Sequence, residues 1–145
     1  MRLATRDDCL DLAPRMREED VQELLHLNGL GPRENLLLLF HQGETFAVVW
    51  GDEVVALFGH YGYPGMIGVP WMLASPTLSK IRKSFLSECR EYVQRILSVY
   101  GKLENYVWTE NEVHIKWLRW LGFEFDPPVP HGINDQPFQR FYMKE

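Results

Sequence analysis

One stretch of the chain, residues 102–125, constrains the fold more than any other because it joins strand, helix and strand signals without a break. Residues 103–108 form a short apolar run with aromatic and β-branched side chains, which is typical of a buried strand. Thr109 and Glu112 have the spacing of a capping box, so a helix is predicted there, and Gly122 is its expected end. This succession indicates an α/β or α+β domain rather than a helical bundle or a β-sandwich.

The apolar positions of this helix predict which of its sides is buried. They recur at helical spacing and comprise Val113, Trp117, Trp120 and Leu121, with Ile115 and Leu118 widening the stripe. We therefore expect this stripe to lie in the core, and we interpret Trp71, Trp108, Trp117 and Trp120 as core residues rather than a substrate platform. After the helix, Phe123 and Phe125 alternate with a polar residue, which predicts another strand.

The remaining sequence predicts strands and helices in a fixed order. The first part has a short strand over residues 2–5, a helix within residues 9–27 that is capped by Asp7 and Asp8 and broken at Pro14, and a helix from Gly31 to Phe40. A hairpin of residues 45–50 and 54–59 and a strand within residues 61–75 follow. A long helix from Pro76 to Tyr100, capped by Ser75, precedes residues 102–125, and a loop over residues 126–137 leads to a last strand over residues 138–143. Pro70 cannot donate to a sheet ladder, so its strand is expected to have an edge or a bulge there.

Composition narrows the class of protein. The chain has 145 residues, 46% of them hydrophobic, which is enough for one core, so residues 1–145 are expected to form a single domain. Its net charge of -5 gives no general attraction to nucleic acid or to an anionic membrane, so neither is an expected partner. The two cysteines and five histidines lack metal-ligand spacing, and no apolar run approaches the roughly 20 residues of a membrane helix. We expect a soluble intracellular protein without a metal site.

The predicted order of elements resembles the GNAT superfamily of acyl-CoA-dependent N-acyltransferases over essentially the whole chain. Members commonly show Asn, Ala, Tyr and Gly-Phe at positions that here hold Asn111, His114, Leu118 and Gly122-Phe123. A narrower resemblance is to the GNAT-like proteins of tailed phages grouped with podophage internal virion protein A. It rests on the stretches RLATRDD, MREEDVQELL, VVALFGHYG, PWMLASP, NYVW, IKWLRWLGF and PFQRFYM.

The resemblance implies a three-layer α+β fold and an acyl-CoA site. The sheet should be mixed and mostly antiparallel, with the strands of residues 69–75 and 103–108 adjacent, parallel and splayed between flanking helices. Acetyl-CoA or another acyl-CoA should bind at this splay, with its phosphates on the amides at the start of the following helix. The residues implied in cofactor binding are Leu73, Ser75, Thr77, Ser79, Lys80 and Asn111. A well-capped helix with a solvated basic turn is the other interpretation of residues 73–80.

The sequence departs from the family pattern at two chemical positions. The glycine-containing signature of the phosphate loop is absent, and Pro76 removes one amide from that loop. Leu118 stands where members often have the tyrosine that protonates the departing thiolate, and leucine cannot transfer a proton.

Five residues are candidates for a proton-transfer role or for contact with the acceptor. His60, Tyr61 and His114 are the acceptor-side candidates, and Tyr63 and His131 are further possibilities. Each also has a structural interpretation, because aromatic residues at strand ends usually pack and a histidine in a first helical turn is usually solvated.

Two functions agree with these features. The first is a phage-encoded N-acyltransferase that moves an acetyl group from acetyl-CoA to the amine of a small molecule or a protein. The alternative is a noncatalytic GNAT-fold internal virion or virion-assembly protein, whose partners are other phage virion proteins. The expected location is the cytoplasm of a bacterial host, or the virion.

Overall fold

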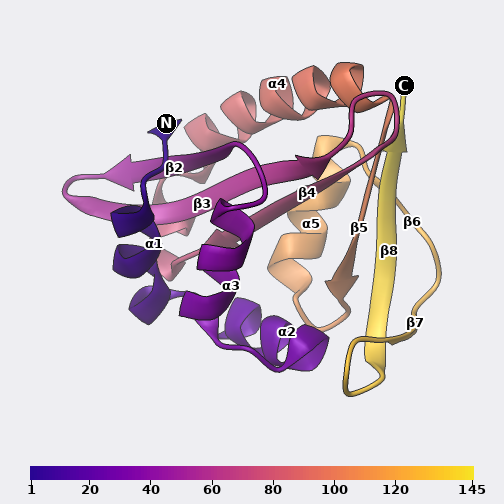
Figure 1. Ribbon diagram of the computed structural model, residues 1–145, viewed down its shortest axis with the longest axis horizontal. Coiled ribbons are helices and arrows are strands. Elements are labelled where there is room, and N and C mark those ends of the chain that lie inside the picture. The colour runs from indigo at the N-terminus through magenta and orange to yellow at the C-terminus, as the bar shows by residue number, and fades with distance from the viewer.

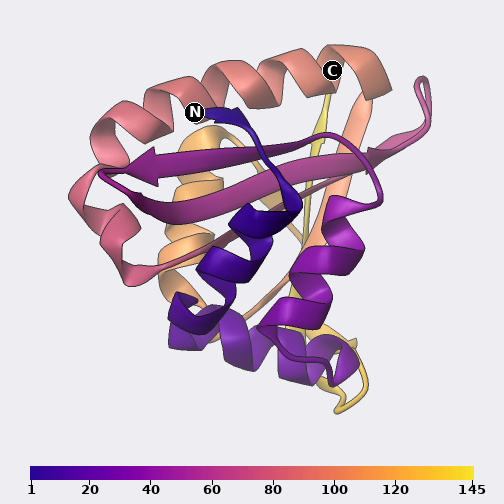
Figure 2. The same ribbon diagram turned by 60° about the vertical axis from the view of Figure 1, so that its left-hand side comes forward.

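An eight-stranded mixed sheet forms the centre of the molecule, with helices on both faces (Figures 1 and 2). The computed structural model describes residues 1–145, the side chain of Arg82 excepted. The strands are β1 (Arg2–Leu3), β2 (Thr45–Trp50), β3 (Glu53–Gly62), β4 (Ile67–Ala74), β5 (Lys102–Trp108), β6 (Glu124–Phe125), β7 (Val129–His131) and β8 (Gln136–Lys144). The helices are α1 (Arg6–Leu12), α2 (Glu18–Asn28), α3 (Pro32–Phe40), α4 (Arg82–Tyr100) and α5 (Glu112–Leu121), with 3-10 turns at Ala13–Arg15 and Pro76–Lys80.

Two hydrophobic clusters separate the faces of the sheet. The first joins α4 and α5 to one face, and the second joins α1, α2 and α3 to the other. Figure 2 shows α1 and α3 in front of the strands and α4 running along their upper side. None of the helices in the described part of the chain is long and apolar enough to cross a membrane.

The strands β4 and β5 form a parallel pair in an otherwise antiparallel order of β1-β2-β3-β4-β5-β8-β6, with β7 beside β8. They pair only at their first residues, Ile67 with Lys102 and Gly68 with Leu103, and then diverge toward their carboxyl ends (Figure 1). The adjacent, parallel and splayed strands expected from the sequence are therefore confirmed, and so is the mixed α+β fold class.

Pro70 lies in the splay rather than at a bulge. The pairing of β4 with β3 runs without a shift through His60 and Pro70, whereas the irregular step of the sheet is in β2, between Val48 and Val49. The Asn105 Nδ2 on β5 donates to the Pro70 carbonyl at 2.8 Å, so the backbone of Pro70 faces β5. The missing amide of Pro70 thus costs no ladder bond, because β4 is locally an edge strand there.

The long helix begins later than the sequence predicts. Residues after Ser75 form a 3-10 turn, with Leu78 N bonded to Ser75 O and Ile81 N to Leu78 O, and α4 begins only at Arg82. Leu78 is buried in the core under this turn. The tighter turn places the Leu78 side chain against the sheet, and the start of α4 is displaced by six residues from the predicted Pro76.

The cap of α5 is also different from the prediction. Asn111, not Thr109, is the N-cap residue, and its side chain makes no capping bond. The Thr109 amide is bonded to Pro137 O at the start of β8, so the chain still follows the sheet at Thr109, and Glu112 is the first residue of α5 rather than its third. At the first helix, likewise, Thr5 is the cap and Asp8 completes a capping box, so the predicted caps Asp7 and Asp8 lie inside α1.

The buried stripe of α5 is rotated from the predicted one. Ile115, Leu118 and Leu121 are buried, whereas Val113 is 52% exposed and Trp120 is 45% exposed. Ile115, Leu118 and Leu121 are spaced by three residues and form the buried face, whereas Val113 and Trp120 lie outside that face. Within the predicted loop over residues 126–137, β7 pairs with β8, so that segment is partly a strand.

A pair of tryptophan substitutions tests this orientation. Trp117 is partly buried and its ring lies 5.8 Å from that of Phe85, so Trp117→Ala should lower the free energy of unfolding by about 2–3 kcal/mol. Trp120 lies over the Arg90 guanidinium at 3.9 Å on the surface, so Trp120→Ala should cost less than about 1 kcal/mol. Urea denaturation of both variants measures this, and equal losses would contradict the orientation of α5.

Candidate functional site

A cavity of about 250 Å³ passes through the sheet where β4 and β5 diverge. Its walls are mainly apolar and come from both layers of helices. Leu24 on α2, Trp71 on β4 and Leu39 on α3 line the side of the first three helices, and Val93 on α4 and Leu118 on α5 line the opposite side. The mainly apolar walls with a few polar groups are typical of a small-molecule site, although the volume is slightly below the usual range of roughly 300–1,000 Å³.

Two carboxylates on α2 close the wide end of the splay. Asp20 Oδ2 accepts from Ala74 N, the last residue of β4, at 3.1 Å. Glu23 Oε1 accepts from Trp108 N, the last residue of β5, at 2.9 Å. In Figure 1, α2 accordingly lies across the opening between the two strand ends. These bonds satisfy strand amides that have no partner strand there, so α2 holds the two diverging edges together.

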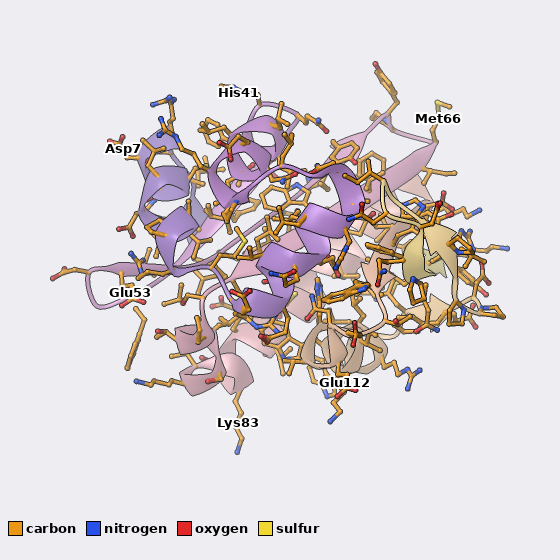
Figure 3. The ribbon with its side chains drawn as sticks, turned by 90° about the horizontal axis from the view of Figure 1, so that it is seen from below. Asp7, His41, Glu53, Met66, Lys83 and Glu112 are labelled. Carbon is orange, nitrogen blue, oxygen red and sulfur yellow. The ribbon has the colours of Figure 1, made fainter. Side chains whose placement is uncertain are left out.

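Asn111 and Arg17 complete this cluster. Asn111 is fully buried, and its Nδ2 donates to Asp20 Oδ1 at 2.9 Å and to Glu23 Oε1 at 3.3 Å. The Arg17 guanidinium contacts Asp20 Oδ1 at 3.0 Å and Asn111 Oδ1 at 3.2 Å, while the Arg17 amide donates to Ala74 O at 2.8 Å. Figure 3 views this end of the molecule, with Glu112 marking the start of α5 beside α2. We call Arg17, Asp20, Glu23 and Asn111 the polar plug.

One carboxyl group of the plug, that of Glu23, has a pKa near neutral pH. Burial, followed by the neighbouring charge of Asp20, raises the pKa of Glu23 to about 8, although the bonds from Trp108 N and Asn111 favour the ionised form. Both of those bonds go to Oε1, and Glu23 also lines the cavity. A buried acid with a pKa near neutrality beside a cavity is a candidate for proton transfer.

Tyr61 and His114 reach the cavity, but from opposite faces of the sheet. Burial raises the pKa of Tyr61, and burial lowers the pKa of His114, which is therefore neutral at pH 7. His60 points elsewhere, because its Nδ1 lies 2.7 Å from the Tyr100 hydroxyl and its Nε2 lies 3.5 Å from Glu44. The structure thus brings two of the three acceptor-side candidates to one cavity.

The two further candidates lie in other surroundings. Tyr63 is exposed in the turn between β3 and β4. The His131 ring stacks on Tyr106, with 3.9 Å between ring centroids, and burial lowers the pKa of His131. The sequence predicts that Trp71, Trp108, Trp117 and Trp120 are core residues. Trp108 is buried, as predicted, whereas Trp120 is exposed.

The residues implied in cofactor binding are dispersed in the structure. Leu73 lines the cavity and Asn111 belongs to the polar plug. Ser75 is buried, Thr77 Oγ1 donates to Glu53 at 3.2 Å, and Ser79 Oγ donates to Pro76 O at 3.0 Å.

Lys80 points away from the splay. Its ammonium lies 5.4 Å from the centre of the Trp50 ring, at the tip of the β2–β3 hairpin. Ser75 precedes this turn but its hydroxyl makes no capping bond, so the cap predicted at Ser75 is absent. The turn over residues 75–80 can be interpreted as a self-bonded turn as well as an anion site.

Most backbone hydrogen-bonding groups of β4 that face the splay already have a partner within the protein. Residues of a strand point their backbone groups alternately to its two edges, so Pro70, Met72 and Ala74 share the edge that faces β5. The Pro70 carbonyl is bonded to Asn105, and Ala74 is bonded to Asp20 and Arg17. Met72, between them, is left to offer an amide and a carbonyl to a ligand in the cavity, which it also lines.

Sequence reasoning did not single out Arg17, Asp20 or Glu23. A signal was nevertheless present, because helical spacing puts Asp20, Glu23, Leu24 and Leu27 on one face of α2. Carboxylates inside an apolar stripe are costly to bury unless they are hydrogen-bonded, so they predict that hydrogen-bond donors lie opposite them in the fold.

Solved structures with this fold are GNAT acetyltransferases. Spermidine N-acetyltransferase from Vibrio cholerae in complex with CoA and spermine aligns with a TM-score of 0.71 at 14% identity, covering 99% of this chain and 93% of that one. A Bacillus subtilis acetyltransferase in complex with CoA aligns at 0.66 and 12% identity, covering 99% and 97%. Campylobacter jejuni N-acetyltransferase PseH, in complex with acetyl coenzyme A, aligns at 0.54 and 17% identity over 77% and 79%. The chain has the GNAT fold, as its sequence indicates.

Sequence similarity leads to a phage protein. The family described as "Bacteriophage T7, probable scaffold protein Gp13" matches residues 63–127. The probable scaffold protein gp13 of Escherichia phage T7 is 31% identical over 90 residues, which are 56% of this chain and 63% of the phage protein. The resemblance to phage proteins is thereby confirmed, over a matched segment shorter than two thirds of that relative.

Proposed function

We propose that the protein is an acyl-CoA-dependent N-acyltransferase whose reaction takes place in the cavity between β4 and β5. The observation that carries this proposal is the position of Glu23, whose pKa of about 8 is found at the wall of a cavity that crosses the sheet. The GNAT fold supports it, because structures with the same arrangement of strands contain CoA or acetyl coenzyme A.

The residues of the cavity supply two of the groups that amide formation needs. An amine nitrogen bonds to the thioester carbon, the carbon–sulfur bond breaks, and the amine loses a proton. Glu23, when ionised, accepts that proton, and the Met72 amide faces the splay where it can donate to the carbonyl oxygen as negative charge develops. Leu118 lines the cavity and offers no proton to the leaving thiolate, which therefore takes its proton from solvent.

An acyl-CoA donor would fit only part of the splay between β4 and β5, because the wide end of the splay is occupied. An acyl-CoA can pair with Met72, but Asp20 and Arg17 already occupy the backbone of Ala74. The turn at Pro76–Lys80 has no glycine through which a pyrophosphate could approach closely. Acetyl-CoA or another acyl-CoA is therefore expected to bind weakly, with the thioester end in the cavity.

The occupied splay also favours a second function, that of a noncatalytic phage assembly protein. In this proposal the polar plug replaces the cofactor and stabilises the scaffold, which contacts other virion proteins in the host cytoplasm or in the virion. The similarity to the T7 protein named as a probable scaffold protein supports it.

Titration with acetyl-CoA, combined with a change at Glu23, distinguishes the two functions. For the acyltransferase, calorimetry should detect acetyl-CoA binding, and Glu23→Gln should keep that binding while lowering the acylation rate about a hundredfold or more. Glu18→Gln, on the exposed first turn of α2, is the matched control and should change neither quantity. Absence of heat at millimolar acetyl-CoA would reject the acyltransferase and leave the assembly protein.

A further inference from the structure

The part of the cavity that faces α2 and α3 combines flat and aliphatic side chains with the uncharged amides of Asn28, Asn35 and Gln42. Trp71 and Leu39 pack with Leu24 in the hydrophobic cluster of that face. Tyr61 joins them, because it is two residues from Gly59 on the same strand and therefore projects to the same side. Gly59 itself lies so close to Trp71 that an added Cβ would be 3.0 Å from the indole ring. The indole is thereby fixed as a wall of the cavity.

The charges of this cavity are few. Among the described side chains that line it, Glu23 is the only carboxylate, and none is a lysine or an arginine. A ligand with several ammonium groups would have to leave most of them without a carboxylate in a mainly apolar enclosure, which is costly. A ligand with one ammonium group and an apolar body would leave none unpaired.

The cavity reaches the surface beside α3. Leu38 lines it and is 51% exposed, and Gln42, just beyond the end of α3, lines it and is also exposed. Tyr61 and Trp71 are half-buried whereas Glu23 is buried and belongs to the plug, so we infer that a ligand entering here meets the two aromatic walls before Glu23. The apolar body of the ligand would therefore lie toward the entrance, and its amine would lie toward Glu23.

We propose that the acceptor is a primary amine on a flat apolar body, which enters beside α3 and places its amino group at Glu23. This inference rests on the proposed acyltransferase function, since it names the acceptor for that same cavity. It assigns a monoamine of aromatic size rather than a polyamine.

The test uses three probes that separate the amine from the apolar body. Tryptamine carries both, tryptophol has a hydroxyl in place of the amine, and spermidine has amines without an aromatic body. Calorimetry on the full chain at pH 8.5 should show tryptamine binding about tenfold more tightly than tryptophol or spermidine, because only tryptamine makes both kinds of contact. Glu23→Gln should remove the preference for tryptamine over tryptophol and leave tryptophol binding unchanged.

A second pair of variants locates the entrance without touching the plug. Leu38→Trp should weaken tryptamine binding about tenfold by narrowing the mouth beside α3. Leu30→Trp, at an exposed leucine in the turn between α2 and α3 that does not line the cavity, should leave binding unchanged. Spermidine binding as tight as tryptamine, or binding insensitive to Leu38→Trp, would overturn the inference.

The outcome for the donor separates this inference from the proposed function. If acetyl-CoA binds and tryptamine does not, the acceptor class is wrong and the acyltransferase stands. If tryptamine binds with the stated dependence on Glu23 and acetyl-CoA does not, the amine site stands and the acyltransferase fails.

Discussion

Asp20→Ala should lower the free energy of unfolding by about 3–5 kcal/mol, because it removes one member of a buried, hydrogen-bonded cluster. The substitution would leave the Ala74 amide without its acceptor and Arg17 without its nearest carboxylate. Asp20 is 1% exposed, so little water can replace the lost contacts. Urea denaturation at pH 7 measures the loss, with circular dichroism to confirm that the variant is folded at the start.

Glu19→Ala is the matched control for this change. Glu19 is adjacent in sequence and also contacts Arg17, at 3.1 Å, but its side chain is 47% exposed. An exposed ion pair is worth little, so Glu19→Ala should cost less than about 1 kcal/mol. If the two variants lost the same stability, the polar plug would not be what holds the diverging ends of β4 and β5 together.

The parts of the fold that were predictable from sequence depend on local patterns. The helix stop at Gly122, the hairpin around Gly51 and the break near Pro14 each act within a few residues, and the structure has an element boundary at or next to each. The parallel pair of β4 and β5 followed from the resemblance to the GNAT superfamily. Exact helix starts were less predictable, because tertiary contacts of Leu78 and Thr109 decide where α4 and α5 begin.

The polar plug was not predictable in the same way, because its partners are far apart in the sequence. Asn111 and Asp20 are separated by 91 positions, and Trp108 and Glu23 by 85. Helical spacing places Asp20 and Glu23 on the buried face of α2, but only the folded sheet shows that two unpaired strand amides lie opposite them. The same fact explains why the candidate site shifts from residues 73–80 toward Glu23.

Glu23→Gln should stabilise the protein by an amount that grows with pH. Burial and Asp20 raise the pKa of Glu23 from 4.5 to about 8. The folded protein therefore keeps this proton up to about pH 8, whereas the unfolded chain releases it above about pH 4.5. The stabilising contribution is fully present below pH 4.5 and is lost as pH rises to about 8, with a slope of roughly 1.4 kcal/mol per pH unit. Glutamine imitates the neutral carboxyl and removes that slope.

Denaturation of the wild type and Glu23→Gln at several pH values measures the difference. The variant should gain on the order of 3 kcal/mol over the wild type between pH 5 and 8 and nothing more at higher pH. His114 titrates with the opposite sign, because burial lowers its pKa, but it is present in both proteins and cancels in the comparison. Glu18→Gln, on the exposed first turn of the same helix, should show no such gain. Parallel stability curves for the wild type and Glu23→Gln would mean that Glu23 is ionised in the folded protein, and its role as a proton acceptor poised near neutral pH would have to be abandoned.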